Sequence, residues 1–225
     1  MSPNPRAIAL FGGSFDPIHS GHMAVARSAV KRFGLDRIYF VPSGVPPHKP
    51  RRHLAAYAHR AAMVALACAD HPELSVSLAE AGNDGGGNQV FYSIDTVRHF
   101  RHTLHAQGRI YFIMGADQFL GIATWKDYET LLGLCDFIVA NRPGFRMEAL
   151  RLVIPPELLG RRGEKSAHDD ESAIPLRRTA VCPLTTVSSH VSSTEIRRRI
   201  RHGQAIGGLV PLRVEEYIEK QALYR

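Results

Sequence analysis

Residues 12–22 run Gly12-Gly13-Ser14-Phe15-Asp16-Pro17-Ile18-His19-Ser20-Gly21-His22. A short apolar run at residues 7–11 precedes them and predicts a buried strand, while residues 23–30 after them have the pattern of a helix. A strand, a glycine turn and a helix N-terminus together form an anion site, because backbone N–H groups and the helix dipole converge there. His19 and His22 are three residues apart at the helix start, so both rings are expected to face that anion.

The composition is that of an ordinary globular protein. Of the 225 residues, 44% are hydrophobic and 22% are charged, which is enough for a substantial core. This length is typical of one domain with a small appendage, and two domains are possible. The formal net charge of +7 fits two kinds of partner, nucleic acid and anionic small molecules such as nucleotides. We interpret most of the arginine runs as solvated faces.

The cysteines and the hydropathy pattern bear on the cellular location. Cys68, Cys135 and Cys182 are far apart and odd in number, which fits neither a disulfide framework nor a zinc site. Cys68 and Cys135 lie in apolar segments and are expected to be buried. No segment approaches 18 apolar residues, and residues 1–6 lack the apolar stretch of a signal peptide. We therefore expect a cytoplasmic protein.

Strand and helix patterns alternate along the chain. After the strand at 7–11, strand patterns lie at residues 37–42, 74–78, 110–115, 137–140 and 180–184. Helix patterns lie at 55–69, 93–107, 125–134 and 211–222. Ser93 is the expected cap of one helix, and Ser192 or Ser193 caps another that begins there. This alternation predicts the α/β class, with a doubly wound parallel sheet, helices on both faces and a small C-terminal helical part.

The ends of the predicted strands are polar or rich in glycine. They comprise Gly12-Gly13, Pro42-Ser43, Gly115-Ala116-Asp117 and Asn141-Arg142-Pro143. Ligands of such sheets bind at the carboxyl ends of the strands, so these four segments are expected to line one site. Residues 83–88 and 160–173 have almost no apolar content and are expected to be surface loops.

Several motifs carry a family resemblance. The Gly-Gly and His-x-Gly-His frame resembles that of the nucleotidyltransferase superfamily, where this motif binds the phosphates of ATP. The further matches are Val45-Pro46-Pro47-His48-Lys49, Tyr92-Ser93-Ile94-Asp95-Thr96, Met114-Gly115-Ala116-Asp117, Thr124-Trp125, Asn141-Arg142-Pro143-Gly144 and Ser192-Ser193-Thr194-Glu195-Ile196-Arg197. Together, and over nearly the whole chain, they resemble the bacterial nicotinate-nucleotide adenylyltransferases.

The resemblance implies a fold and a reaction. The fold would be Rossmann-like, with a nucleotide-binding catalytic domain at residues 1–185 and a C-terminal helical segment at 186–225 packed on it. The reaction would be the transfer of the adenylyl group of ATP to nicotinate mononucleotide, which gives deamido-NAD and pyrophosphate in NAD biosynthesis. Mg²⁺ would be bound by the ATP phosphates and by no protein ligand directly. A homodimer or higher homo-oligomer is compatible with the sequence, whereas membrane and nucleic-acid partners are not expected.

The resemblance also implies roles for individual residues. The catalytic set would be His19, His22, Lys49 and Arg197. ATP would be bound by Gly12, Gly13, Ser14, Phe15, Gly21, His48, Ser193 and Thr194. The mononucleotide would be bound by Tyr92, Ser93, Thr96, Asp117, Thr124, Trp125 and Arg142.

The chemistry of these side chains suits those roles. Nucleotidyl transfer needs positioned hydrogen-bond donors on an increasingly charged phosphorus centre, which histidine and arginine supply. Trp125, the single tryptophan, is suited to stack on a pyridine ring. Without the resemblance, the sequence would fit a solvated lysine at position 49 equally well, and it would fit a simple helix cap at Ser193. Asp16 is expected to shape the turn rather than to bind a metal.

Three alternatives remain open from the sequence. The substrate could be nicotinamide mononucleotide, or both mononucleotides, because few groups discriminate the two bases. Another substrate of the superfamily, such as phosphopantetheine or glycerol phosphate, is disfavoured by the Tyr92–Thr96 and Thr124-Trp125 elements. A non-catalytic basic protein that binds nucleotides or RNA is the most remote reading, and it would show salt-dependent RNA binding without turnover.

Overall fold

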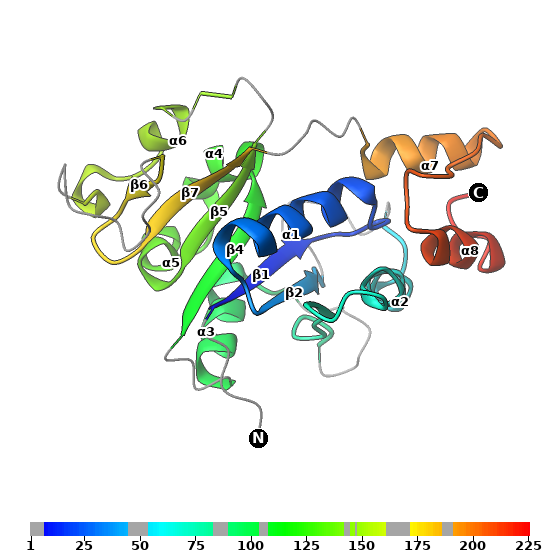
Figure 1. Cartoon of the computed structure of the whole chain (residues 1–225), viewed down its shortest axis with the longest axis horizontal. Coiled ribbons are helices and arrows are strands. Elements are labelled where there is room, and N and C mark those ends of the chain that lie inside the picture. Colours follow the sequence, from blue (N-terminus) through cyan, green and yellow to red (C-terminus); the bar gives the residue numbers. More distant parts are fainter. Residues whose placement is uncertain are drawn as a thin grey trace. The chain divides into compact units, whose positions relative to one another are not determined.

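The computed structural model describes residues 7–44, 54–82, 90–103, 108–141, 145–146, 148–160, 172–185 and 191–225. Its strands form one seven-stranded sheet in the order β3-β2-β1-β4-β5-β7-β6 (Figure 1). They are β1 (Ala7–Gly13), β2 (Arg37–Pro42), β3 (Leu74–Val76), β4 (Arg109–Gly115), β5 (Asp136–Asn141), β6 (Ile174–Pro175) and β7 (Ala180–Thr185). β1 pairs in parallel with β4, β2 with β3, β4 with β5 and β5 with β7. The predicted α/β class with a parallel sheet is therefore confirmed.

The helices come from the predicted segments and from several short ones. They are α1 (Ser20–Phe33), α2 (Tyr57–Cys68), α3 (Ser93–Thr103), α4 (Ala116–Leu120), α5 (Tyr128–Leu134), α6 (Glu148–Leu152), α7 (Ser193–Arg201) and α8 (Leu212–Lys220). Two short 3₁₀ helices lie at Ile122–Thr124 (η2) and Pro156–Leu158 (η3). Among the described residues no helix is long and apolar enough to cross a membrane. α7 and α8 form the expected C-terminal helical part.

Two local predictions were wrong. The helix expected at 125–134 begins only at Tyr128, because Trp125 is extended (ψ 146°) and Asp127 adopts a left-handed conformation (φ 50°). Ser93 is not a cap, since the helix begins at Ser93 itself and the carbonyl of Tyr92 accepts from Asp95 and Thr96.

The chain divides into two compact units, which we describe separately. Unit 1 comprises Met1–Phe11, Ser28–Arg37 and Tyr92–Ser188. Its core is the continuous apolar run of β4 between its buried neighbours in β1 and β5, as expected of a central parallel strand. α3 packs on α5, and the Arg101 guanidinium of α3 donates to the Leu134 carbonyl at the end of α5 (2.9 Å from Nε).

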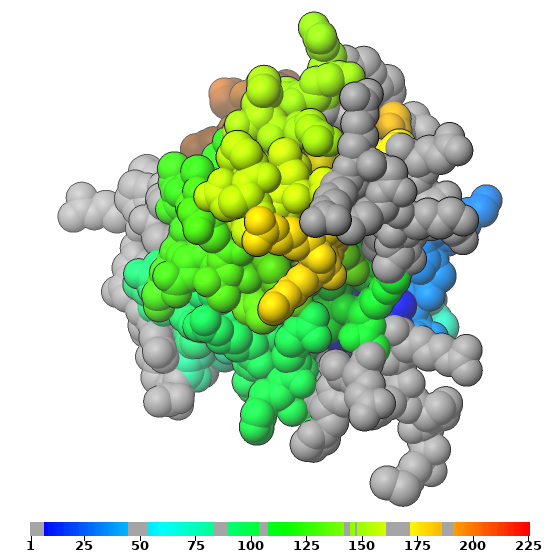
Figure 2. All heavy atoms as spheres, turned by 90° about the vertical axis from the view of Figure 1, so that its left-hand side faces the viewer, coloured from blue at the N-terminus to red at the C-terminus, as the bar shows by residue number. Residues whose placement is uncertain are grey.

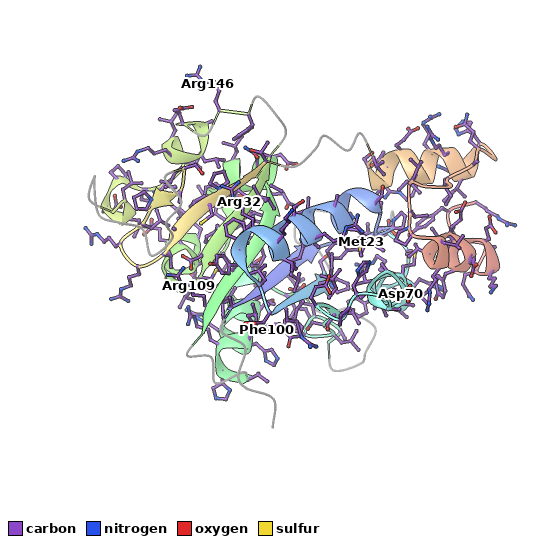
Figure 3. All side chains as sticks on the ribbon, viewed as in Figure 1. Met23, Arg32, Asp70, Phe100, Arg109 and Arg146 are labelled. Carbon is purple, nitrogen blue, oxygen red and sulfur yellow. The ribbon has the colours of Figure 1, made fainter. Side chains whose placement is uncertain are left out.

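No pattern in the sequence predicts β6. This two-residue strand pairs antiparallel with β7 and holds Pro175, which lacks an N–H donor and suits the edge of a sheet. Figure 2 shows the surface of unit 1 on which the green to yellow segments, from α3 to β6, lie next to one another. Arg32, labelled in Figure 3, reaches the Ser172 hydroxyl at 3.4 Å.

Unit 2 comprises Gly12–Arg27, Ile38–Phe91 and Ser189–Arg225. Within it α2 packs on α8, and the two lie side by side in Figure 1. Two side-chain contacts join this pair. His59 Nδ1 lies 3.0 Å from the Tyr217 hydroxyl, and Arg213 donates to Asp70 at 3.0 Å; Asp70 is labelled in Figure 3. The segment after α7 is also tied to the start of α1, because the Ser20 N–H donates to the Leu209 carbonyl (2.9 Å). The boundary expected at residues 185/186 stays a prediction.

The three cysteines are all buried, as expected of Cys68 and Cys135 in particular. Burial raises the pKa of the Cys68 thiol to about 12 and raises that of Cys135 further. Both thiols therefore stay protonated and behave as small hydrophobic groups.

Candidate active site

The turn between β1 and α1 is shaped by Phe15. Its backbone is left-handed (φ 45°), and its ring is 1% exposed and packs edge-on against Phe40 and His22, with centroids 5.4 and 5.1 Å apart. A Cβ on Gly13 would lie 2.9 Å from Phe15 Cζ, closer than real Cβ contacts come. Gly13 is therefore required by packing as well as by any ligand that approaches the backbone. Because the Phe15 ring is buried, only its backbone is left to face a ligand at this turn.

The two histidines of the turn lie face to face. The His19 and His22 rings are stacked, with centroids 3.7 Å apart and an interplanar angle of 26°. The His19 backbone N–H donates to His22 Nδ1 at 3.3 Å, so Nδ1 carries no proton and the neutral His22 ring holds its proton on Nε2. His19 Nδ1 is buried and has no hydrogen-bond partner among the described residues. The expected shared orientation of the two rings is confirmed.

Both histidines are neutral at pH 7. Burial lowers the pKa of His19 from its ordinary 6.5 to about 4. Burial also lowers the pKa of His22 well below its usual range, and repulsion from His19 lowers it further. A phosphate placed against the pair would reverse both effects, because an adjacent anion favours the charged imidazolium. The pair is thus suited to gain positive charge when an anion arrives.

Asp16 is a fully buried centre of contacts. Its Oδ1 accepts hydrogen bonds from the Tyr224 hydroxyl (2.7 Å) and the Ala55 N–H (3.1 Å), and its Oδ2 lies 3.4 Å from Arg197 Nη1. The carboxylate is therefore used to hold the turn, as predicted. In the part of the chain that the structure describes, no group of three His, Cys, Asp or Glu side chains is placed to hold a metal ion.

The start of α7 is fastened to the same turn. Ser192 caps the helix by accepting from the Glu195 N–H (3.2 Å), which leaves the Ser193 hydroxyl to donate to the Pro17 carbonyl (2.9 Å). Arg197 donates from Nη1 to the Asp16 carbonyl (2.6 Å). Its Nη2 lies 3.4 Å from Thr194 Oγ1. The first turn of α7 and the turn after β1 thus form one polar cluster.

The other arginines of α7 are differently placed. Arg198 and Arg199 both bind the carboxylate of Glu195, at 2.8 and 3.0 Å. Hydrogen bonds from these two guanidinium groups lower the pKa of Glu195 to about 2. Of the three consecutive arginines, Arg197 is the one that contacts Asp16.

Arg60 is a residue that the motifs did not reveal. It is 2% exposed, and its guanidinium donates to the carbonyls of Ser14 (2.8 Å), Gly44 (3.3 Å) and Ala55 (3.0 Å). It therefore joins the turn after β1 to the segment after β2. The available signal was a single arginine within the mostly apolar stretch Tyr57–Cys68. A buried cation is retained only where several acceptors surround it.

The first residue after β2 and the start of α2 each contribute one further polar group. The Ser43 N–H donates to the Gly13 carbonyl (2.8 Å), while Ser43 Oγ and the Tyr57 hydroxyl are buried without a hydrogen-bond partner among the described residues. Burial raises the pKa of Tyr57 to about 12. His48 and Lys49 lie outside the described residues.

The residues expected to bind the mononucleotide belong to unit 1. The Trp125 ring is half-buried and packs edge-on against Phe112, with centroids 6.0 Å apart. Lys126 places Nζ 4.4 Å from the centroid of the Tyr92 ring and 3.4 Å from Asp95 Oδ2. Tyr92 and Lys126 thus meet at the start of α3, with Trp125 next in sequence to Lys126.

The remaining predicted residues of unit 1 are more scattered. Thr96 is buried and its hydroxyl donates to the Tyr92 carbonyl (3.4 Å), while exposed Thr124 donates to the Gly121 carbonyl (2.8 Å). Asp117 is exposed in α4, and Ser93 is half-buried at the first position of α3. Arg142 lies outside the described residues.

A comparison with protein families decides the affiliation of the chain. The family described as cytidylyltransferase-like matches residues 10–199, which include β1 from Leu10 onward, both histidines and α7 as far as Arg199. The chain belongs to the cytidylyltransferase-like family. Its membership agrees with the Gly-Gly and His-x-Gly-His frame, which lies within the matched residues.

Individual proteins are similar to this chain over almost its whole length. A protein of Moorella thermoacetica named "Probable nicotinate-nucleotide adenylyltransferase" is 39% identical over 98% of this chain and 93% of its own length. One of Thermoanaerobacter sp. with the same name is 36% identical over 97% and 94%. A solved structure, "Plasmodium falciparum nicotinic acid mononucleotide adenylyltransferase complexed with NaAD", is 20% identical, covers 97% of both chains and has a TM-score of 0.71. This likeness confirms the expected nucleotidyltransferase fold.

Proposed function

We propose that this protein transfers the adenylyl group of ATP to nicotinate mononucleotide and releases pyrophosphate, which makes deamido-NAD. Its relatives at 36–39% identity bear the name of that activity over nearly their full length. The observation that carries the proposal on the side of the chemistry is the stacked pair His19 and His22 at the start of α1. Neutral rings at a helix N-terminus, with one Nε2–H fixed as a donor, are suited to a phosphate chain.

The transfer is an in-line displacement at phosphorus. A phosphate oxygen of the mononucleotide forms a bond to the α-phosphorus of ATP, the bond from that phosphorus to the oxygen bridging to the β-phosphorus breaks, and pyrophosphate leaves with the electron pair. No covalent enzyme intermediate is needed, so the protein contributes position and charge. His19 and His22 donate to the oxygens on which negative charge increases, and their burial makes each such bond stronger than it would be in water.

Other groups of unit 2 would hold the rest of ATP. Backbone N–H groups of Gly12, Gly13, Ser14 and Phe15, together with Gly21, line the turn, and Ser193 and Thr194 begin α7, where the helix dipole favours an anion. Arg197 would bind the β- or γ-phosphate through guanidinium donors not used by the turn. His48 and Lys49 would reach the phosphates from the segment after β2.

Mg²⁺ would enter as part of the substrate, bound to the phosphates of ATP. The residues near the turn fit a metal ion that is held by ATP. The oxygens of the buried Asp16 carboxylate already accept hydrogen bonds from Tyr224, Ala55 and Arg197, so they are occupied without a metal. A phosphate-bound Mg²⁺ keeps several water ligands and needs few or no protein carboxylates.

The mononucleotide would be bound by residues of unit 1. Trp125 would stack on the pyridine ring, and Asp117 would accept from a ribose hydroxyl. Backbone N–H groups near Ser93 and Trp125 would bind the nicotinate carboxylate, whereas an amide would also need an acceptor. Tyr92, Thr96, Thr124 and Arg142 complete the proposed set. A cytoplasmic location and a homo-oligomeric state stay predictions.

Pyrophosphate release tests the proposal. The full chain is supplied with ATP and Mg²⁺ and with either nicotinate or nicotinamide mononucleotide, and the dinucleotide product is identified by mass. Faster turnover of the nicotinate substrate is expected. Equal rates would replace the proposal by a dual-specificity enzyme, and no release with either substrate would refute it. The His22→Ala variant should lose turnover, while His102→Ala, at an exposed position of α3, is the matched histidine control.

A further inference from the structure

Tyr224 lies beyond α8 and reaches back to the turn after β1. Its hydroxyl donates to Asp16 Oδ1 at 2.7 Å, and the side chain is partly buried. Burial and the neighbouring Asp16 carboxylate raise the pKa of Tyr224 far above its ordinary 10. The phenol therefore stays protonated over the working pH range, and Asp16 is the acceptor of this hydrogen bond.

The two oxygens of Asp16 have different partners. Oδ1 is taken by Tyr224 and by the Ala55 N–H, whereas Oδ2 stands 3.4 Å from Arg197 Nη1. The shorter contact of Arg197 is with the Asp16 carbonyl oxygen, at 2.6 Å. The guanidinium is thus anchored by the backbone and is not joined to the carboxylate in a tight two-point ion pair, which would be shorter.

We propose that Tyr224 is a positioning residue for ATP, whose hydroxyl fixes the Asp16 carboxylate so that the Arg197 guanidinium stays available to the phosphates. This inference rests on the proposed function, in which Arg197 binds ATP. Arg197 is 23% exposed on its side-chain surface, so part of the guanidinium is accessible. Tyr224 itself touches no reacting atom.

The loss of the hydroxyl would shift Arg197 rather than Arg60. A fully buried carboxylate deprived of its 2.7 Å donor turns to the nearest cation, since burying an incompletely bonded charge is costly. Arg60 is held by three carbonyl oxygens at 2.8–3.3 Å and has little freedom to respond. Arg197 would therefore close onto Asp16 and present less positive charge to ATP.

The chain offers a matched control. The Tyr217 hydroxyl of α8 also forms one hydrogen bond within unit 2, but its partner is His59 Nδ1 of α2, at 3.0 Å, and not Asp16. α8 is further held by the contact of Arg213 with Asp70. The packing of α8 on α2 therefore does not depend on Tyr224, and Tyr224→Phe is expected to fold.

The experiment compares the full chain with Tyr224→Phe and Tyr217→Phe. Isothermal titration gives the Kd for ATP with Mg²⁺, steady-state kinetics give the KM of each substrate, and thermal melts give Tm. Because a hydrogen bond to a charged group is typically worth a factor of ten or more, Tyr224→Phe should raise the Kd and KM for ATP about ten-fold. It should change the KM for nicotinate mononucleotide by less than about two-fold, and Tyr217→Phe should change neither KM beyond that limit.

Each outcome is decisive for the proposal. An ATP Kd of Tyr224→Phe within about two-fold of the parent value would overturn it, and so would an equal rise in both KM values with a matching fall in Tm. If the parent chain binds ATP but makes no dinucleotide, the proposed function fails, and the comparison of ATP Kd values still tests Tyr224 separately.

Discussion

Acidification should destabilise this protein through His19. The folded state holds the pKa of this ring at about 4 because the ring is buried, whereas an unfolded chain restores its ordinary value of 6.5. Between these two values the unfolded state binds a proton that the folded state does not. Stability is therefore fully present above pH 6.5, is lost as the pH falls toward 4, and changes no further below 4 on account of this ring.

The size of the effect follows from the gap in pKa. At about 1.36 kcal/mol per unit, the full gap corresponds to roughly 3 kcal/mol, of which about 2 kcal/mol is lost between pH 7 and pH 5. The ring is 8% exposed, so solvent screening removes little of this. His22, whose pKa is also lowered, contributes with the same sign.

Urea unfolding at pH 7 and at pH 5 measures this loss, with His19→Asn as the comparison. The carboxylates and the other histidines titrate in both proteins, so the difference between their pH dependences isolates His19 and its effect on His22. The parent chain should lose about 2 kcal/mol more than His19→Asn over this range. Parallel pH dependences of the two proteins would show that His19 is protonated in the folded state and would refute the reasoning.

Three further substitutions test other parts of the site. His22→Ala should lower kcat by about 10²–10⁴-fold without lowering Tm, because the lost donor acts on charge in the transition state; near-normal turnover would remove this ring from the mechanism. Trp125→Ala should raise the KM for the mononucleotide more than that for ATP, and an equal rise in both would make Trp125 structural. Gly13→Ala should destabilise the fold by about 1–3 kcal/mol, because its Cβ would lie 2.9 Å from Phe15. Gly133→Ala, where nothing lies within 4 Å, is the control and should instead stabilise α5 by up to about 1 kcal/mol; equal effects of the two changes would refute the packing argument.

The sheet was predictable because its strands are strongly patterned. β4 is a continuous apolar run, and β2 was predicted with the bounds that the structure has. The short elements were not predictable in the same way. α4 and α6 have five residues each, too few to show a helical period, and β6 has two. Their positions are determined by packing on neighbouring elements, which no local pattern records.

The residues of the candidate site also differ in how far a local sequence pattern could predict them. His19, His22, Ser193 and Arg197 could be found because each belongs to a motif that is local in the sequence. Arg60 and Tyr224 could not, because they act through tertiary contacts with the turn, 46 residues from Ser14 in one case and 208 from Asp16 in the other. Arg60 in addition binds only carbonyl oxygens, which every residue supplies, so no partner side chain marks its role.

The same burial explains both the acid sensitivity of the turn and its suitability for phosphate chemistry. The exclusion of water from the His19 and His22 rings lowers their pKa values. At pH 7 both rings are therefore neutral and add no positive charge to the site. In the same low-dielectric surroundings a negative charge that develops on the phosphate oxygens would act on the rings more strongly than it would in water. In the proposed reaction Arg197 would hold ATP before the transfer, whereas the histidines would respond most when the negative charge is greatest. In the proposed reaction, differential binding of this kind would lower the barrier, because it favours the transition state over the bound substrates.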